Sequence, residues 1–483
     1  MKAAPKLLNN DATVLLPRDL FSDLQLDKIL SEQAVSVLQK PCGQSEIVHR
    51  NELFSMIDKE ENLVQIEILL STLFATEKAL HLLKDAKIAL DKYHRYAEVL
   101  SLYANSCQCL ASMHNFGDLF ADVAKYFSSD EKQRCYVEIK KSVQKINALL
   151  EHLHIGLLSF ADKIWLTPNY DAVSEADTIA LLAESLGFTV PKKKAQNTKI
   201  NLSLSDAICR LYAAEVAQIE SEISKFASVD FYEPTEYIPE IKFFLEIHGL
   251  IQKVKNIGVP HCIAKISKEP IYMAKELYDI SLLAKNCNHI VPNDADFTEN
   301  EAFCFLLGAN GGGKTTYLRT VGINLILFLA GCPVFARNAE IYPFDIILSH
   351  FPKDERFDNT GRLDEERTRT EEMLKSAQGK AAFLLFNETF SGTDNKRGFE
   401  LLTDAAAQIG ENHYFGLYVT HFHEVMSLDY SVLSAEVDPA DENKRTFRIV
   451  KSKGSASSYA ADILKKYGID KASLEARRGR HGN

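Results

Sequence analysis

Residues 308–316, which read GANGGGKTT, constrain the fold more than any other stretch of this chain. They satisfy the pattern GxxxxGK[ST] in full. An apolar run (303–307) precedes them and a helical pattern (317–328) follows, so a strand, a loop and a helix come in that order. Glycines let backbone N–H groups curl around the β- and γ-phosphates of a nucleotide at the start of a helix. A glycine-rich turn that matches by chance does not account for this context.

Each position of this loop has an expected task. Lys314 places a point charge on the phosphates, and the Thr315 hydroxyl is available to Mg²⁺. The nucleotide-binding residues predicted from the motif are Gly308, Ala309, Asn310, Gly311, Gly312, Gly313, Lys314, Thr315 and Thr316.

The pattern of apolar residues and glycines changes near residue 260. Before it, residues 20–255 contain few glycines and long amphipathic runs, which predict single helical stretches over 61–90, 203–228 and 238–256. After it, short apolar runs at 302–308, 381–388, 415–421 and 446–451 alternate with turns and helical patterns. This alternation predicts an α/β P-loop domain with a mostly parallel sheet over 260–483, preceded by an all-α domain over 1–259.

A second strand ends in polar residues, in the stretch FLLFNETFSGTD (383–394). Glu388 is placed to orient or deprotonate a water that attacks the nucleotide. Asn387 stands where an aspartate would help to hold Mg²⁺, and its carbonyl oxygen accepts hydrogen bonds without bringing a charge. The third strand ends in His421, which can position a γ-phosphate by hydrogen bonding. If each motif is considered alone, the simpler interpretation is that Asn387 and Glu388 are surface residues at a strand end and that His421 is structural.

Composition limits the class of protein and its surroundings. The 483 residues are 46% hydrophobic and 25% charged, which is ordinary for a folded protein. The net charge of -11 does not resemble a basic nucleic-acid coat, although a local basic face would still allow such binding. Nine scattered cysteines without a CxxC pair argue against a zinc site or a disulfide framework. No run reaches the ~20 apolar residues of a membrane span, so a cytoplasmic, reducing location is expected.

Several motifs together resemble one family, the MutS DNA mismatch-repair ATPases, whose nucleotide domain is of the ABC class. The resemblance is strong over 268–470. There IVPND (290–294), the loop and helix from 308, FNETFSGTD and YVTHFHEV occur in the family's order, as does the late Ser-Tyr stretch within 446–469. It is weaker over the helical half, where EIVHRNELFSMI (46–57) and the paired long helices are similar to the family's core and lever domain.

The resemblance implies an ATPase that uses ATP and Mg²⁺ and works as a homodimer through its nucleotide domains. Glu388 and His421 would be catalytic, and Thr315, Asn387 and Glu388 would lie around the metal. A signature segment, Ser391, Gly392, Thr393 and Asp394, would complete the partner's site. His289 lies roughly where the family stacks an aromatic side chain on adenine. Asn387, Asp394 and Ser391 depart from residues common in repair enzymes, and Asn387 puts the rate of hydrolysis in question.

Two functions from different classes follow. The first is an ATP-dependent DNA-binding ATPase whose nucleotide changes the grip of helical levers on nucleic acid, duplex or branched DNA. About 260 residues before the ATPase domain leave no room for a separate mismatch-reading domain, so no mismatch-reading wedge is expected. The alternative is a slowly hydrolysing ATP-binding switch or scaffold that acts through protein or ribosome partners. A small-molecule kinase is disfavoured by the FSGTD and His421 arrangement. The partner, the effect of Asn387 and the timing of dimerisation stay open.

Overall fold

The computed structural model describes residues 4–8, 14–153, 156–160, 163–167, 202–284, 290–352, 362–391, 395–438 and 441–452. They divide into two compact units that alternate along the chain. The helical unit comprises residues 1–8 and 56–242, and the α/β unit comprises residues 9–55 and 243–483. Within the described ranges, no helix has the length and apolar character that crossing a membrane requires.

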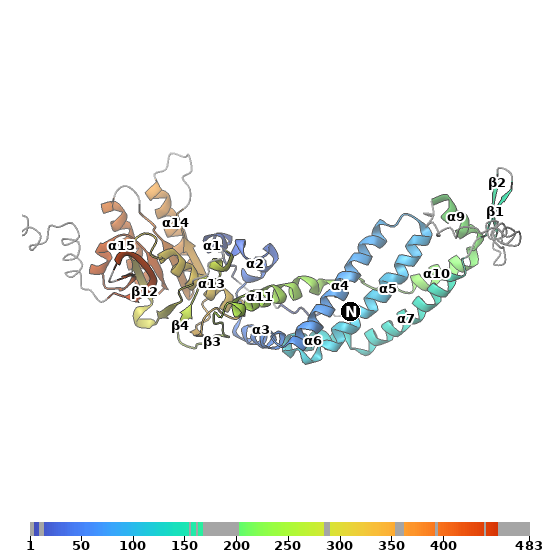
Figure 1. Ribbon diagram of the computed structural model, residues 1–483, viewed down its shortest axis with the longest axis horizontal. Coiled ribbons are helices and arrows are strands. Elements are labelled where there is room, and N and C mark those ends of the chain that lie inside the picture. The colour runs from blue at the N-terminus through green and yellow to red at the C-terminus, as the bar shows by residue number, and fades with distance from the viewer. Residues whose placement is uncertain are drawn as a thin grey trace, which may run out of the picture. The chain divides into compact units, whose positions relative to one another are not determined.

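The helical unit is built from long helices that pack side by side (Figure 1). The α5 helix packs against α4 and α7, and α7 packs against α10. A two-stranded antiparallel hairpin, β1–β2, lies between α7 and α9 in the chain. The elements of this unit are α4 (Glu60–Asp85), α5 (Ala89–Ser112), η2 (Met113–Asn115), α6 (Gly117–Phe127), α7 (Asp130–Glu151), β1 (Gly156–Phe160), β2 (Lys163–Thr167), α9 (Leu202–Leu211), α10 (Ala213–Ser224) and η3 (Glu233–Tyr237).

Two of the helices that the sequence predicts as continuous are interrupted. The helix predicted over 61–90 ends at Asp85, because Ala86 and Ile88 have extended backbones, and α5 starts at Ala89. The helix predicted over 203–228 breaks at Tyr212, whose backbone is not helical, and so becomes α9 and α10. The prediction over 238–256 agrees with α11 (Ile238–Asn256), which crosses from the helical unit into the α/β unit at residues 242 and 243.

A network of buried polar groups holds η3 against the helices of its unit. The Glu233 carboxylate accepts hydrogen bonds from the Tyr126 hydroxyl (2.5 Å) and, less closely, from the Tyr103 hydroxyl (3.4 Å). It also pairs with the Lys132 ammonium at 2.5 Å, and both side chains of this pair are about 15% exposed. Lys132 lies over the Tyr126 ring as well, 4.9 Å from its centre. The charges of this network are therefore balanced within the unit.

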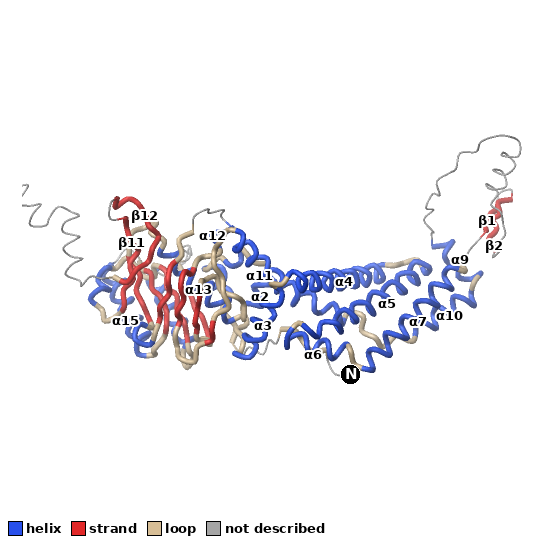
Figure 2. The backbone as a smooth tube through the Cα atoms, turned by 60° about the horizontal axis from the view of Figure 1, so that its bottom comes forward, coloured by secondary structure: helices blue, strands red, loops and turns tan. Residues whose placement is uncertain are grey.

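The α/β unit is centred on a six-stranded sheet, drawn in red in Figure 2. Its strand order is β12-β11-β6-β10-β9-β8, and all neighbours are parallel except β11 and β12. The bounds are β6 (Phe303–Leu307), β8 (Ile346–His350), β9 (Ala382–Asn387), β10 (Phe415–Val419), β11 (Ser431–Asp438) and β12 (Asp441–Lys451). Every residue of β6, β9 and β10 is buried, as expected for parallel strands covered by helices on both faces.

Helices and a smaller sheet complete this unit. The helix α13 (Lys314–Leu329), almost entirely buried, packs against β9 and β10, and α14 (Arg362–Ala377) packs against β8. The smaller sheet has the order β3-β7-β4-β5. The remaining elements are β3 (Lys265–Ile266), β4 (Tyr272–Leu277), α12 (Ser281–Ala284), β5 (Asn293–Phe297), η4 (Glu299–Glu301), β7 (Asn338–Ile341), α15 (Asn395–Glu411) and η5 (His423–Ser427).

An early segment of the chain also belongs to this unit. It contains α1 (Arg18–Asp23), η1 (Leu26–Lys28), α2 (Glu32–Leu38) and α3 (Gln44–Ile57), of which all but the last two residues fall in the unit. The side chain of Leu24 lies against Gly322 of α13, where a Cβ atom would come within 2.9 Å of it. The Arg50 guanidinium donates to the Ala330 carbonyl (2.9 Å) at the end of α13, and the Cys42 amide donates to the Leu329 carbonyl (2.7 Å). The carbonyl groups at the end of α13 therefore accept hydrogen bonds from residues that lie about 280 positions earlier in the chain.

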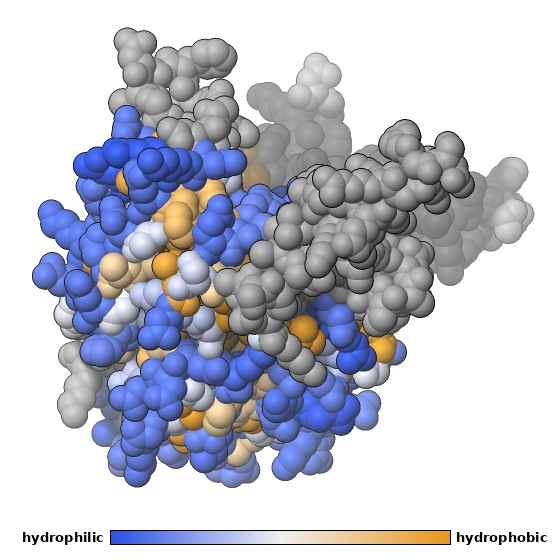
Figure 3. All heavy atoms as spheres, turned by 90° about the vertical axis from the view of Figure 1, so that its left-hand side faces the viewer, coloured by the Kyte–Doolittle hydropathy of each residue, from blue (hydrophilic) through white to orange (hydrophobic). Residues whose placement is uncertain are grey.

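The surface of the α/β unit is mixed on the face shown in Figure 3. Outside the residues drawn in grey, hydrophilic side chains surround small, separate groups of hydrophobic ones. Small scattered groups of this kind are normal on a protein surface.

Candidate active site

The loop between β6 and α13 has the backbone that the glycine-rich motif requires. Gly308, Gly311 and Gly313 all have positive φ angles, of 134°, 73° and 90°. A Cβ atom at Gly308 would lie 2.8 Å from the Cβ of Ala435, and one at Gly312 would lie 3.0 Å from the Ala309 carbonyl oxygen. Side chains at these positions would therefore push the loop apart. The loop leads directly into the first turn of α13, whose free N–H groups and helix dipole favour an anion.

Lys314 lies folded back on this loop. Its ammonium donates to the Gly308 carbonyl (2.8 Å) and more weakly to the Ala309 carbonyl (3.3 Å), and the side chain is only 4% exposed. Burial lowers the pKa of Lys314 below its ordinary value, and the nearby Glu388 carboxylate opposes that shift. The two carbonyls therefore hold the charge at the mouth of the loop, where phosphate oxygens are better partners.

The end of β9 approaches the loop at its first helical turn. The Thr315 hydroxyl donates to the Asn387 side-chain oxygen at 3.0 Å, and Asn387 is 9% exposed. Both groups, with Glu388 as the next residue, present oxygen atoms to the same edge of the sheet. Oxygen is the ligand that Mg²⁺ prefers, so this set fits the metal, although with one charge fewer than an aspartate would give.

Glu388 and His421 meet at the ends of neighbouring strands. The Glu388 carboxylate lies 2.9 Å from the His421 Nε2 atom, and the Glu388 amide donates to the Val419 carbonyl at 2.8 Å. Their side chains are 31% and 40% exposed, so water has access to both. Since β10 lies between β6 and β9, His421 is placed between the loop and the Glu388 strand.

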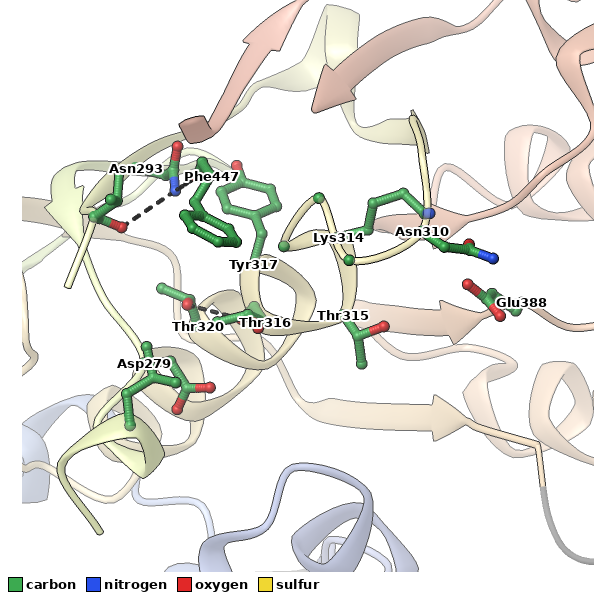
Figure 4. A pocket seen from close by; sticks show the side chains of 15 residues that line it. Asp279, Asn293, Asn310, Lys314, Thr315, Thr316, Tyr317, Thr320, Glu388 and Phe447 are labelled. Carbon is green, nitrogen blue, oxygen red and sulfur yellow. Dashed lines mark hydrogen bonds between the residues drawn. The ribbon is translucent and has the colours of Figure 1, made fainter. Parts of the chain in front are cut away.

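A cavity of about 540 Å³ runs along the loop and the first two turns of α13. At one end it is lined by the loop from Asn310 onward and by Glu388 (Figure 4). Figure 4 shows Asp279, Asn293, Thr320 and Phe447 toward the other end, and Leu282 and Val291 also line the cavity.

Phe447 is a lining residue that the sequence does not point to. It lies on β12 with a φ angle of 57°, and its side chain is 48% exposed. Asn293 holds the strand there, because its amide donates to the Phe447 carbonyl (3.0 Å) and its oxygen accepts from the Ile449 amide (2.7 Å). Figure 4 shows the Phe447 ring beside the helical turn that carries Tyr317. The pattern TFRIVK predicts a strand but carries no signal for this ring position.

Some predicted site residues cannot be placed. His289 and the signature residues Gly392, Thr393 and Asp394 lie outside the described residues. Ser391 is described and exposed, directly after the turn that contains Glu388. The structure thus brings together Lys314, Thr315, Asn387, Glu388 and His421.

A glycine-rich phosphate loop between a parallel strand and a buried helix, with polar groups at the next strand ends, defines a P-loop nucleotide-binding domain. Residues 304–478 match the family model for MutS domain V, a P-loop ATPase domain. The match covers less than half of the 483 residues, and this part of the chain belongs to the MutS domain V family.

Its relatives bear names from DNA mismatch repair and from nuclease action. The DNA mismatch repair protein msh-2 of Neurospora crassa is 33% identical over 141 residues, which is 29% of this chain and 15% of that protein. Endonuclease MutS2 of Streptococcus suis is 24% identical over 282 residues, 54% of this chain and 36% of that protein. The DNA mismatch repair protein MutS of Listeria welshimeri is 28% identical over 266 residues, 50% of this chain and 29% of that protein. The chain therefore matches about a third or less of the length of these curated relatives.

Proposed function

We propose that this chain is an ATP-hydrolysing, nucleic-acid-binding protein in which a nucleotide changes the grip of the helical unit on DNA. One observation carries the enzymatic part of the proposal. Lys314 and Thr315 from the phosphate loop, Asn387 and Glu388 from the next strand end, and His421 between them are gathered at one edge of the sheet.

Each of these side chains has a different role in the transfer of the γ-phosphate to water. The loop N–H groups and Lys314 bind the β- and γ-phosphates and stabilise the negative charge that develops there. Glu388, with access to water, orients the attacking molecule and accepts its proton. His421 lies beside Glu388 through its Nε2 atom and would turn this nitrogen toward the γ-phosphate when ATP is bound. Mg²⁺ would be held by Thr315 and Asn387 with Glu388 nearby, and it supplies charge neutralisation on the phosphates when bound.

The nucleoside would lie at the far end of the cavity. Phe447 is the aromatic side chain there that is exposed enough to stack on a purine base. His289, the candidate from the sequence, stays a prediction. We therefore assign base stacking to Phe447 as part of the proposal.

The rest of the proposal concerns assembly. We propose an ABC-type arrangement in which two copies face each other and Ser391–Asp394 of one copy covers the γ-phosphate bound to the other. The exposure of Glu388 and His421 supports it, because a site open to solvent gains stabilisation when a partner covers it. Residues 1–259 would then act as MutS-like core and lever, and residues 260–483 as the ATPase domain. The names of the relatives support DNA as the partner.

Steady-state hydrolysis of ATP tests the enzymatic part. Wild type, Glu388→Gln and Asn387→Asp are compared with and without Mg²⁺, with ATP binding measured in parallel. We expect Glu388→Gln to lower kcat by about 10²-fold or more while ATP still binds. Asn387→Asp should raise kcat, because it restores a charge beside the metal. If wild type is no faster than Glu388→Gln, the protein is the slowly hydrolysing switch instead.

Binding and mass measurements test the assembly. Duplex and branched DNA are titrated at increasing salt, and the mass is measured with and without ATP using Glu388→Gln to prevent turnover. We expect twice the chain mass with ATP and an affinity for DNA that falls steeply with salt. Absence of binding to either DNA at low salt would remove nucleic acid from the proposal.

A further inference from the structure

The turn that follows β9 is held in an unusual backbone conformation. Glu388 and Phe390 both have positive φ angles, of 52° and 63°, although neither is glycine. Such angles are unfavourable for residues with a side chain, above all for a bulky aromatic one. They persist where the surrounding structure fixes them. The turn comprises residues 388–391, from Glu388 to the signature residue Ser391.

One buried carboxylate binds the centre of this turn. Glu366, on α14, accepts a hydrogen bond from the Phe390 amide through Oε2 at 2.7 Å. Glu366 is 5% exposed and Phe390 is 1% exposed, so the bond is shielded from water. A bond to a charged acceptor is stronger than one between neutral groups, and shielding strengthens it further.

Three other elements hold the neighbouring atoms. The Thr389 hydroxyl lies 2.9 Å from the His350 Nδ1 atom at the end of β8. The Thr389 carbonyl accepts from the Tyr418 hydroxyl of β10 at 3.0 Å. Gly398, on α15, lies so close to the Phe390 carbonyl that a Cβ atom would collide with it. The turn is therefore fixed from α14, β8, β10 and α15 together.

From this arrangement we infer that Glu366 is a positioning residue, which keeps Phe390 in its left-handed conformation and thereby sets Glu388 and Ser391 at the same time. Without the Glu366 bond, the Phe390 backbone relaxes toward a negative φ angle. The chain on either side of Phe390 then rotates. The Glu388 carboxylate is no longer directed at the attacking water, and Ser391 no longer faces the partner copy. The inference rests on the proposed hydrolysis and names a device that supports it.

The test compares variants of Glu366 in the full chain. Glu366→Ala removes the acceptor, whereas Glu366→Gln keeps an oxygen that can accept the same hydrogen bond. The matched control is Glu371→Ala, an exposed glutamate of the same helix, which pairs with Arg367. The measurements are kcat, KM for ATP, the melting temperature and hydrogen exchange in the peptide that contains the Phe390 amide.

We expect Glu366→Ala to lower kcat by about 10–100-fold and to change KM by less than about twofold, because the phosphate loop is untouched. Glu366→Gln should stay within about threefold of wild type, and Glu371→Ala should be unchanged. Exchange at Phe390 should be faster in Glu366→Ala alone. A kcat of Glu366→Ala equal to wild type, or an equal fall in Glu366→Gln, would overturn the inference.

A second variant changes the contact between α15 and the turn. Gly398→Ala removes no hydrogen bond but pushes on the Phe390 carbonyl, so it should also lower kcat and leave KM nearly unchanged. An unchanged kcat in Gly398→Ala would contradict a fixed turn. If wild type hydrolyses no ATP, the proposed function fails, whereas hydrogen exchange at Phe390 still decides whether Glu366 holds the turn.

Discussion

The helical unit and the α/β unit use polar side chains in opposite ways. In the helical unit, Glu233 is surrounded by donors from α5, α6 and α7, and its charge is matched by Lys132. In the α/β unit, Lys314 is held by two backbone carbonyls, and Glu388 and His421 remain open to solvent. The first arrangement is complete in itself. The second leaves two side chains accessible to a ligand, as the proposed hydrolysis requires.

The largest effect is expected from Lys314→Ala. Removing the charge from the phosphate loop should lower kcat/KM for ATP by about 10³-fold, because that charge faces the γ-phosphate as it leaves. The melting temperature without nucleotide should barely change, since Lys314 bonds the carbonyls of its own loop. The control is Lys375→Ala, at an exposed lysine of α14. A large loss of stability in Lys314→Ala would mean that this lysine holds the fold and so break the comparison.

The opposite result is expected from Glu233→Leu in the helical unit. It should lower the free energy of unfolding by about 3 kcal/mol, since Lys132 is left mostly buried without this partner. Urea unfolding followed by circular dichroism measures this loss. The rate of ATP hydrolysis by the folded variant should stay within about twofold of wild type. The control is Glu236→Gln, an exposed glutamate of the same short helix, and an equal loss in that variant would refute a specific role for the network.

A smaller effect is expected from Phe447→Ala at the nucleoside end of the cavity. Losing a stacked ring should weaken ATP binding by about three- to tenfold and leave kcat nearly unchanged. Isothermal titration with ATP and a steady-state assay separate the two quantities. Phe447→Tyr keeps the ring and should bind like wild type. If Phe447→Ala binds ATP normally, the base lies elsewhere.

The smallest effect concerns a salt bridge on the helical unit. Hydrogen bonds from Lys225 and then Ser142 lower the pKa of Glu222 from its ordinary 4.5 to about 2. A carboxyl whose pKa is lowered by folding stabilises the protein above pH 4.5 and loses that contribution as the pH falls toward 2. Wild type should therefore be more stable than Glu222→Gln at pH 6, by less than about 1 kcal/mol because the lysines are exposed. Urea titrations should find that the difference disappears near pH 2, and a constant difference would exclude this cause.

The sequence predicts the glycine-rich loop and the strands around it well, because both signals are local. The predicted strands at 302–308, 381–388 and 415–421 correspond to β6, β9 and β10 within two residues at either end. Interruptions at Ala86 and Tyr212 are single-residue events inside amphipathic patterns, so periodicity does not reveal them.

Long-range contacts are the part that the sequence could not predict. Glu366 occurs in a stretch rich in charged residues, DEERTRTEE, where burial of one carboxylate leaves no signal. Its partner is a backbone amide 24 positions away, which has no sequence signature at all. The ring position of Phe447 likewise depends on Asn293, 154 positions earlier. Such residues become visible only when the fold brings them together.

The contact between Arg50 and the end of α13 has a consequence for how the protein is made. Residues 14–55 leave the ribosome before the helix that they pack against, which follows about 280 residues later. At roughly 5–20 residues per second, that delay lasts about 14–56 seconds. Leu20, Phe21 and Leu24 are buried in the folded protein, and Leu24 lies against Gly322 of α13. These apolar side chains of the early segment therefore stay exposed in the nascent chain until the residues of α13 have been made.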